Sequence, residues 1–308
     1  MANQTPSISD PLFKKYYGYL KLEKNLLNNS VEAYISDIQK LSLYASDIEK
    51  NLINIERNDI IEFMASLRDL GIGARSQARI LSGIKAFYKY LMLDGYIEIN
   101  PTDLIEGPKL GLKLPEVLSV EEINMIIDSV GRDTMENQRN TAILETLYSC
   151  GLRVSEMTQL RFTDLYLKEG YILVKGKGEK HRVVPISDRA IKEIELYTHH
   201  RCHQVVKKEC EDYIFISRLG RPLSRIMIFN IIKKHTEMVG IQKTVSPHTF
   251  RHSFATHLLE GGANLRAIQL MLGHEKITTT EIYIHLDKHI LREEILLHHP
   301  RNNREYCK

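Results

Sequence analysis

The chain has 308 residues, of which 43% are hydrophobic and 26% are charged, with a formal net charge of +3 at pH 7. This length allows two domains with separate cores, and the composition is that of a globular protein, which excludes disordered and coiled-coil classes. No apolar run is long enough to cross a membrane and the first ten residues lack a signal-peptide pattern, so the sequence predicts a cytoplasmic protein.

Cysteine usage and charge add two weaker indications. Lysine and arginine number 12 against 14 acidic residues up to Gly107 and 30 against 25 beyond it, so the excess of positive charge lies in the second part and is compatible with a nucleic-acid partner. The scattered cysteines predict reduced thiols. They are Cys150, Cys202, Cys210 and Cys307. A patch of possible zinc ligands fits no paired two-plus-two site, so a solvated helix end is the favoured interpretation. It comprises His199, His200, Cys202, His203 and Cys210.

Residues 1–107 form a predicted domain of four helices, because apolar residues recur at three- and four-residue intervals between turn signals. The helices are expected at about residues 11–24, 30–46, 58–70 and 75–94. Residues 28–30 (Asn-Asn-Ser) are candidate N-caps for the second helix, and Gly71, Gly73 and Gly95 punctuate the later ones.

The fourth helix has an apolar stripe and a polar side. The stripe consists of Leu81, Ile84, Tyr88 and Leu91. The polar residues are Arg75, Ser76, Arg79, Ser82 and Lys89. A solvated surface explains the polar side. Taken alone, that is the favoured interpretation. The alternative is a helix laid along a DNA groove, and Arg75, Ser76 and Arg79 are then the candidate DNA contacts.

A Pro- and Gly-containing linker at 108–116 separates this domain from a second one at 117–308. Ser119 and Glu122 predict a capping box at its first helix. Helices are followed by three short extended runs, at 165–167, 171–175 and 181–186, which predict a small antiparallel sheet. Lys177 stands between two glycines at the tip of the second hairpin. The fold class is therefore mainly α in two domains, with one small sheet.

Several side chains of the second domain suggest phosphate chemistry. His248 and Arg251 are three residues apart on a predicted helix, a spacing that puts both on one face. Arg153 offers a second guanidinium at the start of another helix, where Glu156 can orient it by an ion pair. Two guanidiniums can hold both non-bridging oxygens of a phosphodiester. Taken singly, the pair of His248 and Arg251 is better explained by a surface or capping role. The alternative for Arg153 and Glu156 is an ordinary surface ion pair.

Lys177, His274 and Tyr283 complete the set of candidates. Lys177 is a mobile cation able to protonate a leaving oxygen, although a basic turn is the usual meaning of such a lysine. His274 follows a helix-ending glycine, and Tyr283 lies in the second turn of a helix whose capping box is Thr278 and Glu281. An isolated tyrosine is more often half-buried than nucleophilic.

The set as a whole resembles the tyrosine site-specific recombinases, and among them the Xer recombinases, with the XerD branch the most similar. The resemblance covers nearly the whole chain and rests on GLRVSEM, VKGKGEKHRVVPI, SPHTFRHSFATHLLEGGANLRAIQLMLGH, TTTEIYIH and the ending LLHHPR. It implies an N-terminal core-binding domain and a C-terminal catalytic domain closing around duplex DNA. Phe250 stands where the family often has Leu, and His181 where it often has Glu or Arg.

The resemblance also implies a mechanism and partners. Tyr283 would attack the scissile phosphate, Arg153 and Arg251 would clamp it with His274, His248 would manage the tyrosine proton and Lys177 would protonate the leaving 5′ oxygen. No cofactor or metal is expected. Four protomers would assemble cyclically on two sites, each docking its helix at 290–297 into a neighbour. A XerC-type recombinase and an FtsK-type translocase are the expected partners in resolving chromosome dimers.

Three alternatives stay open at this point. A mobile-element integrase or transposase would use the same residues, and a type IB topoisomerase-like enzyme would share the arginines and tyrosine but relax DNA as a monomer. A DNA-binding protein without catalysis is the third, and Tyr283 with both arginines argues against it.

Overall fold

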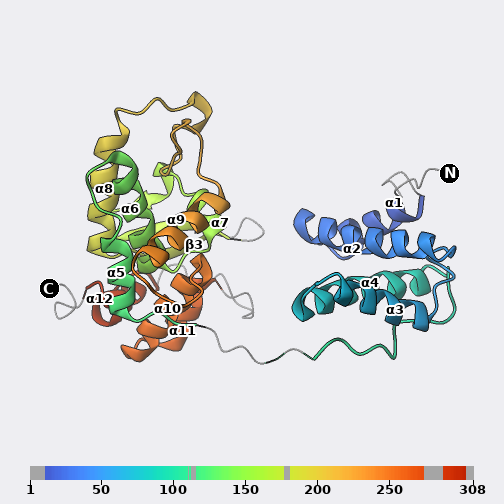
Figure 1. Ribbon diagram of the computed structural model, residues 1–308. Helices are drawn as coiled ribbons and strands as arrows, with labels where there is room; N and C mark the ends of the chain where they lie inside the picture. Colours follow the sequence, from blue (N-terminus) through green and yellow to red (C-terminus); the bar gives the residue numbers. More distant parts are fainter. Residues whose placement is uncertain (1–10, 110, 112–115, 177–180, 274–286, 303–308) are drawn as a thin grey trace. The chain divides into compact units, whose positions relative to one another are not determined.

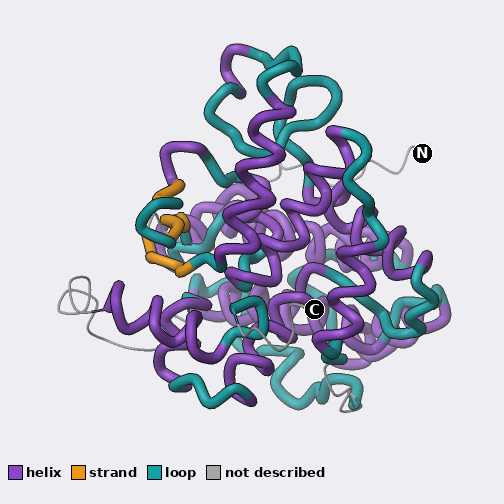
Figure 2. The backbone as a smooth tube through the Cα atoms, turned by 90° about the vertical axis from the view of Figure 1, so that its left-hand side faces the viewer, coloured by secondary structure: helices purple, strands orange, loops and turns teal. Residues whose placement is uncertain are grey.

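The computed structural model describes residues 11–109, 111, 116–176, 181–273 and 287–302. The chain divides into two compact units, Met1–Lys113 and Leu114–Lys308, a division that falls inside the predicted linker (Figure 1). Helices make up most of both units, and the described strands gather in one small sheet (Figure 2). The predicted fold class is confirmed. None of the described helices has the length and hydropathy needed to cross a bilayer.

The first unit contains the four predicted helices. They are α1 (Pro11–Gly18), continued by the π-helical turn η1 (Tyr19–Glu23), then α2 (Asn28–Asp47), α3 (Arg57–Asp69) and α4 (Ala74–Leu93). The predicted capping of α2 by residues 28–30 is wrong. The helix begins one residue earlier, at an N-cap Leu27 without a side-chain bond, and the side chain of Asn28 accepts a hydrogen bond from Lys21 instead.

The core of the first unit takes side chains from all four helices, and α2 packs against α4 within it. The predicted stripe of α4 is buried, with Leu81, Ile84, Tyr88 and Leu91 at most 3% exposed. Asp37 of α2 is also buried, and it accepts two 2.6 Å hydrogen bonds from Arg79 of α4. Gly83 allows this approach, because a Cβ there would lie 2.6 Å from the Asp37 carboxylate.

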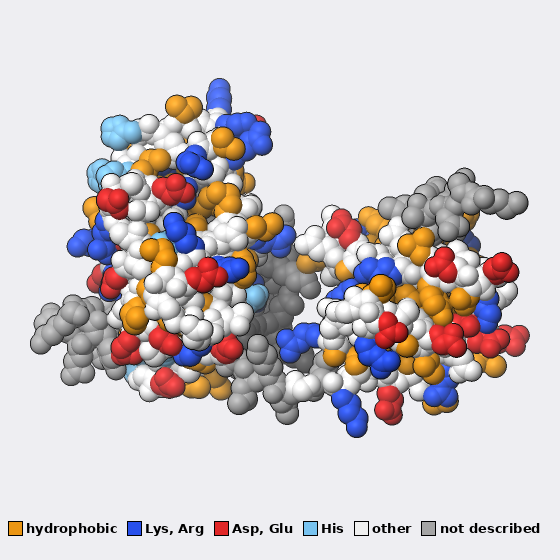
Figure 3. Space-filling view, viewed as in Figure 1, with side chains coloured by type: hydrophobic (Ala, Val, Ile, Leu, Met, Phe, Trp, Pro, Cys, Tyr) orange, Lys and Arg blue, Asp and Glu red, His pale blue; other side chains and the backbone are white. Residues whose placement is uncertain are grey.

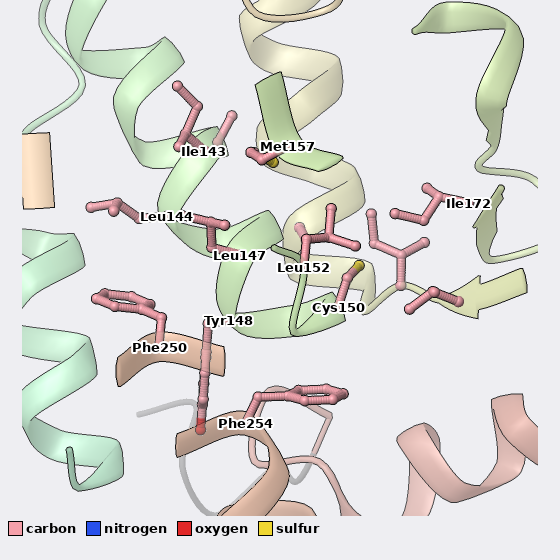
Figure 4. Packing of buried hydrophobic residues seen from close by; sticks show 14 of the residues in the cluster. Ile143, Leu144, Leu147, Tyr148, Cys150, Leu152, Met157, Ile172, Phe250 and Phe254 are labelled. Atoms are coloured by element: carbon pink, nitrogen blue, oxygen red, sulfur yellow. The ribbon is translucent and has the colours of Figure 1, made fainter. Parts of the chain in front are cut away.

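The second unit surrounds a central helix, α6 (Met135–Cys150), whose residues from Gln138 onward are all buried. Phe250 and Phe254 flank Tyr148 of α6 in the packed core (Figure 4). The other helices are α5 (Val120–Asp128), α7 (Val154–Thr158), α8 (Asp188–Arg201), α9 (Arg225–Met238), α10 (Pro247–Glu260), α11 (Leu265–Leu272) and α12 (Asp287–His298), with the 3-10 turns η2 (Phe162–Asp164) and η4 (Lys208–Cys210). The capping box of Ser119 and Glu122 is present at the start of α5.

The sheet has three antiparallel strands in the order β1 (Leu165–Tyr166), β2 (Tyr171–Lys175) and β3 (His181–Pro185), as predicted. Gly170 takes the positive φ that the first turn needs. The register pairs Lys175 with His181 and Val174 with Arg182. It thereby brings Arg182 to the edge of the unit's core.

The C-terminal helix α12 contributes Leu291 and Ile295 to the core of its own unit. Its other large apolar side chains are exposed, namely Ile290, Leu296 and Leu297. The expected docking of residues 290–297 into a neighbouring subunit stays a prediction. The helix continues to His298, and in the tail that follows His299 and Arg301 are buried.

That tail is held by buried polar contacts. Glu145 on α6 is completely buried and accepts a 2.8 Å hydrogen bond from the side chain of Arg301. The backbone N–H of Arg301 donates to Nδ1 of His299, whose Nε2 bonds the carbonyl oxygen of Tyr148 at 3.2 Å. His299 is thereby fixed as the neutral tautomer. Burial and the Arg301 charge lower its pKa to about 3.

The neutral state of His299 makes folding acid-sensitive. Its folded pKa of about 3 lies below the ordinary histidine value of 6.5, so the unfolded chain binds more protons between these pH values and stability falls as the pH drops through them. Between pH 7 and pH 4, the free energy of unfolding should fall by roughly 3 kcal/mol less in His299→Gln than in the native chain. Denaturant unfolding at both pH values measures this difference. The exposed His199→Gln serves as control, and equal acid sensitivity of His299→Gln and the native chain would contradict the assignment.

Candidate active site

Arg153 is positioned by the turn between α6 and α7. Gly151 ends α6 in the left-handed conformation, with φ of +55°, and Leu152 is buried beside it. Arg153 is then the N-cap of α7, and its backbone N–H donates to Oε2 of Glu156 at 2.8 Å. Its Nη1 donates to Oε1 of the same carboxylate, also at 2.8 Å. The pair expected on a helix surface is thus a half-buried link, since Glu156 is 9% exposed.

Arg251 approaches the same place from α10. It is 8% exposed, and its Nη1 and Nη2 donate to the carbonyl oxygens of Gly151 and Leu272 at 2.7 and 2.6 Å. Its Nη1 also lies 4.0 Å from Oε2 of Glu156. Burial and the nearby positive charge of Arg153 lower the pKa of Arg251 to about 10. His248, expected on the same face, lies one turn earlier on α10 and is exposed.

Arg182 of β3 is a third arginine at this carboxylate, and the sequence analysis did not single it out. Its Nη1 and Nη2 donate to Oε1 and Oε2 of Glu156, both at 2.8 Å, in a bidentate pair. Its Nε donates to the carbonyl oxygen of Met271 at 2.7 Å. A single arginine in a short strand carries no pattern that predicts this partner. Only the antiparallel pairing of β3 brings it there.

The Glu156 carboxylate is therefore shared by three guanidiniums. Burial acts to raise its pKa, but the hydrogen bonds and charge of Arg182, followed by those of Arg153, lower it overall, so the group stays ionised. One carboxylate cannot neutralise three arginines. The cluster keeps an excess of positive charge in a poorly hydrated place, which favours an anion with several oxygen acceptors.

The same three arginines bond the C-terminal end of α11. Arg182, Arg251 and Arg153 donate respectively to the carbonyl oxygens of Met271, Leu272 and the C-cap residue Gly273. Cations stabilise a helix C-terminus, where carbonyl groups lack helical partners. The bond from Arg153 is the longest, at 3.4 Å, and the side chain of Arg153 is 38% exposed. Arg153 is thus the arginine best placed to bond an incoming ligand.

Lys177, His274 and Tyr283 lie outside the described residues. The described part of the candidate site is therefore Arg153, Glu156, Arg182 and Arg251. His248 is exposed and precedes Arg251 by one turn on α10. These groups provide fixed N–H donors and positive charge, so they can bind a phosphoryl group and stabilise negative charge that develops on its oxygens. The nucleophile and the proton donors have to come from other residues.

The predicted DNA contacts are on the first unit. Arg75, Ser76 and Arg79 are exposed on α4, and Arg79 is held by the buried Asp37. On the face seen in Figure 3, basic and acidic side chains are interspersed on both units. Among the residues that the structure describes, no three His, Cys, Asp or Glu side chains are placed to hold a metal ion, the histidine and cysteine patch around Cys202 included.

Family models match both units. Residues 116–289 match the phage integrase family, and residues 13–95 match the phage integrase N-terminal SAM-like domain. The chain is 39% identical over 293 residues to tyrosine recombinase XerD of Staphylococcus haemolyticus, with 95% of this chain and 99% of that protein covered. Tyrosine recombinase XerD of Staphylococcus aureus is 38% identical over 293 residues, with the same coverage.

Solved structures share the fold. The XerH site-specific recombinase bound to palindromic difH substrate in a post-cleavage complex has a TM-score of 0.69 and 24% identity, covering 92% of this chain and 83% of that one. A lambda integrase dimer bound to a COC′ core site has a TM-score of 0.68 and 18% identity, covering 88% of this chain and 98% of that one.

The turn that carries Arg153 makes a prediction about stability. At Gly151 a Cβ would overlap the ring of Phe254, whereas at Gly240, which also has positive φ, it would meet nothing within 4 Å. Gly151→Ala should therefore lose roughly 1–3 kcal/mol more stability than Gly240→Ala, because overpacking adds to the cost of the left-handed backbone. Chemical denaturation measures both variants, and equal losses would show that the turn is not tightly packed.

Proposed function

Because the chain belongs to the phage integrase family, as a XerD-like tyrosine recombinase, we propose that it cuts and rejoins duplex DNA at a specific site through a 3′-phosphotyrosyl intermediate on Tyr283. The observation that carries this proposal is the cluster of Arg153, Arg182 and Arg251 around one buried carboxylate. It is built for an oxyanion whose negative charge grows during reaction.

In the first step, the hydroxyl oxygen of Tyr283 attacks the scissile phosphorus. The bond from phosphorus to the 5′ oxygen breaks, the tyrosine proton passes to His248, and Lys177 gives a proton to the leaving 5′ oxygen. The products are a 3′-phosphotyrosyl link and a free 5′ hydroxyl. Rejoining is the reverse attack by a 5′ hydroxyl of a partner strand. It consumes no ATP, because the link keeps the energy of the broken phosphodiester.

Arg153 and Arg251 would hold the two non-bridging oxygens, with His274 as a further donor. Arg251 is buried and its carbonyl partners fix its orientation, so it needs little rearrangement when charge develops. Arg153 has the longer bond and the exposed side chain, and it can turn its Nη2 from Gly273 to the phosphate. Neither arginine transfers a proton in this scheme.

DNA binding is assigned to both units. Arg75, Ser76 and Arg79 of α4 would contact phosphates or base edges, and the pairing with Asp37 limits how far Arg79 can reach.

Two recombination sites would be held by four protomers in a cyclic assembly, in the cytoplasm. A XerC-type recombinase would supply the second pair, and an FtsK-type translocase would activate the complex.

The proposed biological role is resolution of chromosome dimers at cell division. The relatives named tyrosine recombinase XerD support it, because they match 95% of this chain and 99% of their own length. An integrase or transposase of a mobile element is the alternative. Sequencing the DNA bound in cells separates the two: a single chromosomal site supports the first role, and the ends of a mobile element support the second.

Covalent trapping tests the chemistry. Incubation with a nicked suicide site should give a protein–DNA adduct that Tyr283→Phe abolishes, because phenylalanine has no oxygen to attack phosphorus. Tyr166→Phe removes a hydroxyl from the exposed edge of the sheet and should leave the adduct unchanged. An adduct in Tyr283→Phe, or none from the native chain on its own binding site, would contradict the assignment.

Loss of one phosphate donor tests the clamp. Arg251→Ala should lower the single-turnover rate of adduct formation by about 10²–10³-fold, the usual effect of removing one oxyanion donor. The partly exposed Arg266→Ala on α11 is a matched control, expected to react at the native rate. Equal rates for Arg251→Ala and the native chain would remove Arg251 from the mechanism.

A further inference from the structure

Arg182 contacts the Glu156 carboxylate through both terminal nitrogens and the end of α11 through Nε. We infer that Arg182 is a positioning residue, which sets the two phosphate-holding arginines in place without touching the DNA itself. This inference rests on the function proposed above, because it assigns Arg153 and Arg251 to the scissile phosphate.

The first path runs through Glu156. The side chain of Arg182 is 13% exposed against 38% for Arg153, so its ion pair with Glu156 is the better shielded of the two. Arg182 also satisfies one lone pair on each carboxylate oxygen, which fixes the plane of the carboxylate. Arg153 then finds Oε1 in a defined position, at 2.8 Å from its Nη1.

The second path runs through α11. Nε of Arg182 bonds the carbonyl oxygen of Met271, and the next carbonyl, of Leu272, accepts the bond from Arg251. Gly273 leaves room for the side chain of Arg182, because a Cβ there would lie 3.0 Å from its Cδ. By tying β3 to the last turn of α11, Arg182 fixes one of the two carbonyl groups that orient Arg251.

The charge of Arg182 also determines how Glu156 titrates. The charged groups that face Glu156 are Arg153 at the start of α7, Arg182 on β3 and Arg251 on α10. The thiol of Cys150 also feels the charge of Arg182, but burial raises its pKa to about 12 and it stays neutral. Without Arg182, burial would dominate and raise the pKa of Glu156. Protonation of Glu156 as the pH falls would then release Arg153.

The test compares Arg182→Met with Arg132→Met. Arg132 makes the same kind of contact, donating from Nη2 to the buried Glu193 at 3.1 Å, outside the candidate site. Arg182→Met should form the covalent adduct about 10–100-fold more slowly, with DNA affinity unchanged within a few-fold. Its rate should also fall more steeply from neutral to mildly acidic pH than the rates of the native chain and Arg132→Met. Arg182→Lys keeps the positive charge but lacks the planar guanidinium that bonds both carboxylate oxygens. Compared with Arg182→Met, it should restore the native pH profile more than the native rate.

Two further variants keep the outcome decisive. In the double variant Glu156→Gln with Arg182→Met no carboxylate remains to titrate at this position, so the additional loss of rate at acidic pH must disappear. This variant also avoids leaving a buried charge unpaired if Arg182→Met alone does not fold. A native rate and pH profile in Arg182→Met overturns the inference. So does an additional acidic loss that persists in the double variant, or an equal loss in Arg132→Met. Absence of any adduct from the native chain would overturn the proposed function instead.

Discussion

The candidate site depends on one buried carboxylate that three arginines share. Guanidiniums this close repel one another, and burial makes the repulsion stronger because water no longer screens it. Glu156 offsets that repulsion through bonds of 2.8 Å to Arg153 and Arg182 and a 4.0 Å approach to Arg251. It leaves an excess of positive charge, and this excess is what a phosphate can neutralise.

The surrounding fold keeps this arrangement in place. The buried helix α6 ends at Gly151, whose carbonyl oxygen orients Arg251, and the turn that follows delivers Arg153. The sheet delivers Arg182, and the end of α11 offers three successive carbonyl groups to the three arginines. Because these segments are far apart in the sequence, the cluster exists only when the whole unit is folded. A change in core packing can therefore alter phosphate binding without touching an arginine.

Much of this was predictable from local patterns. The stripe on α4, the capping box at Ser119 and the three strands follow from periodicity and turn residues, and Arg153, Glu156 and Arg251 were candidates by residue type. Arg182 was missed, because its partner is set by strand pairing and lies 26 residues away. The predicted cap of α2 failed for a similar reason, since Lys21 takes the side chain of Asn28.

The tail after α12 shows the same limit of sequence reasoning. His299 and Arg301 are residue types that usually lie at the surface, yet both are buried, and the side chain of Arg301 bonds Glu145 of the central helix α6. A polar residue can be buried when its partner is fixed. Periodicity within one segment carries no information about such a partner, whereas the folded chain supplies it.

A structure of the protein bound to its uncleaved DNA site tests the central claim most directly. The account predicts that both non-bridging oxygens of the scissile phosphate lie at hydrogen-bond distance, about 2.7–3.2 Å, from Arg153 and Arg251. Glu156 should keep its bidentate bond to Arg182. A scissile phosphate bound away from these arginines, or a Glu156 that has left them, would contradict it.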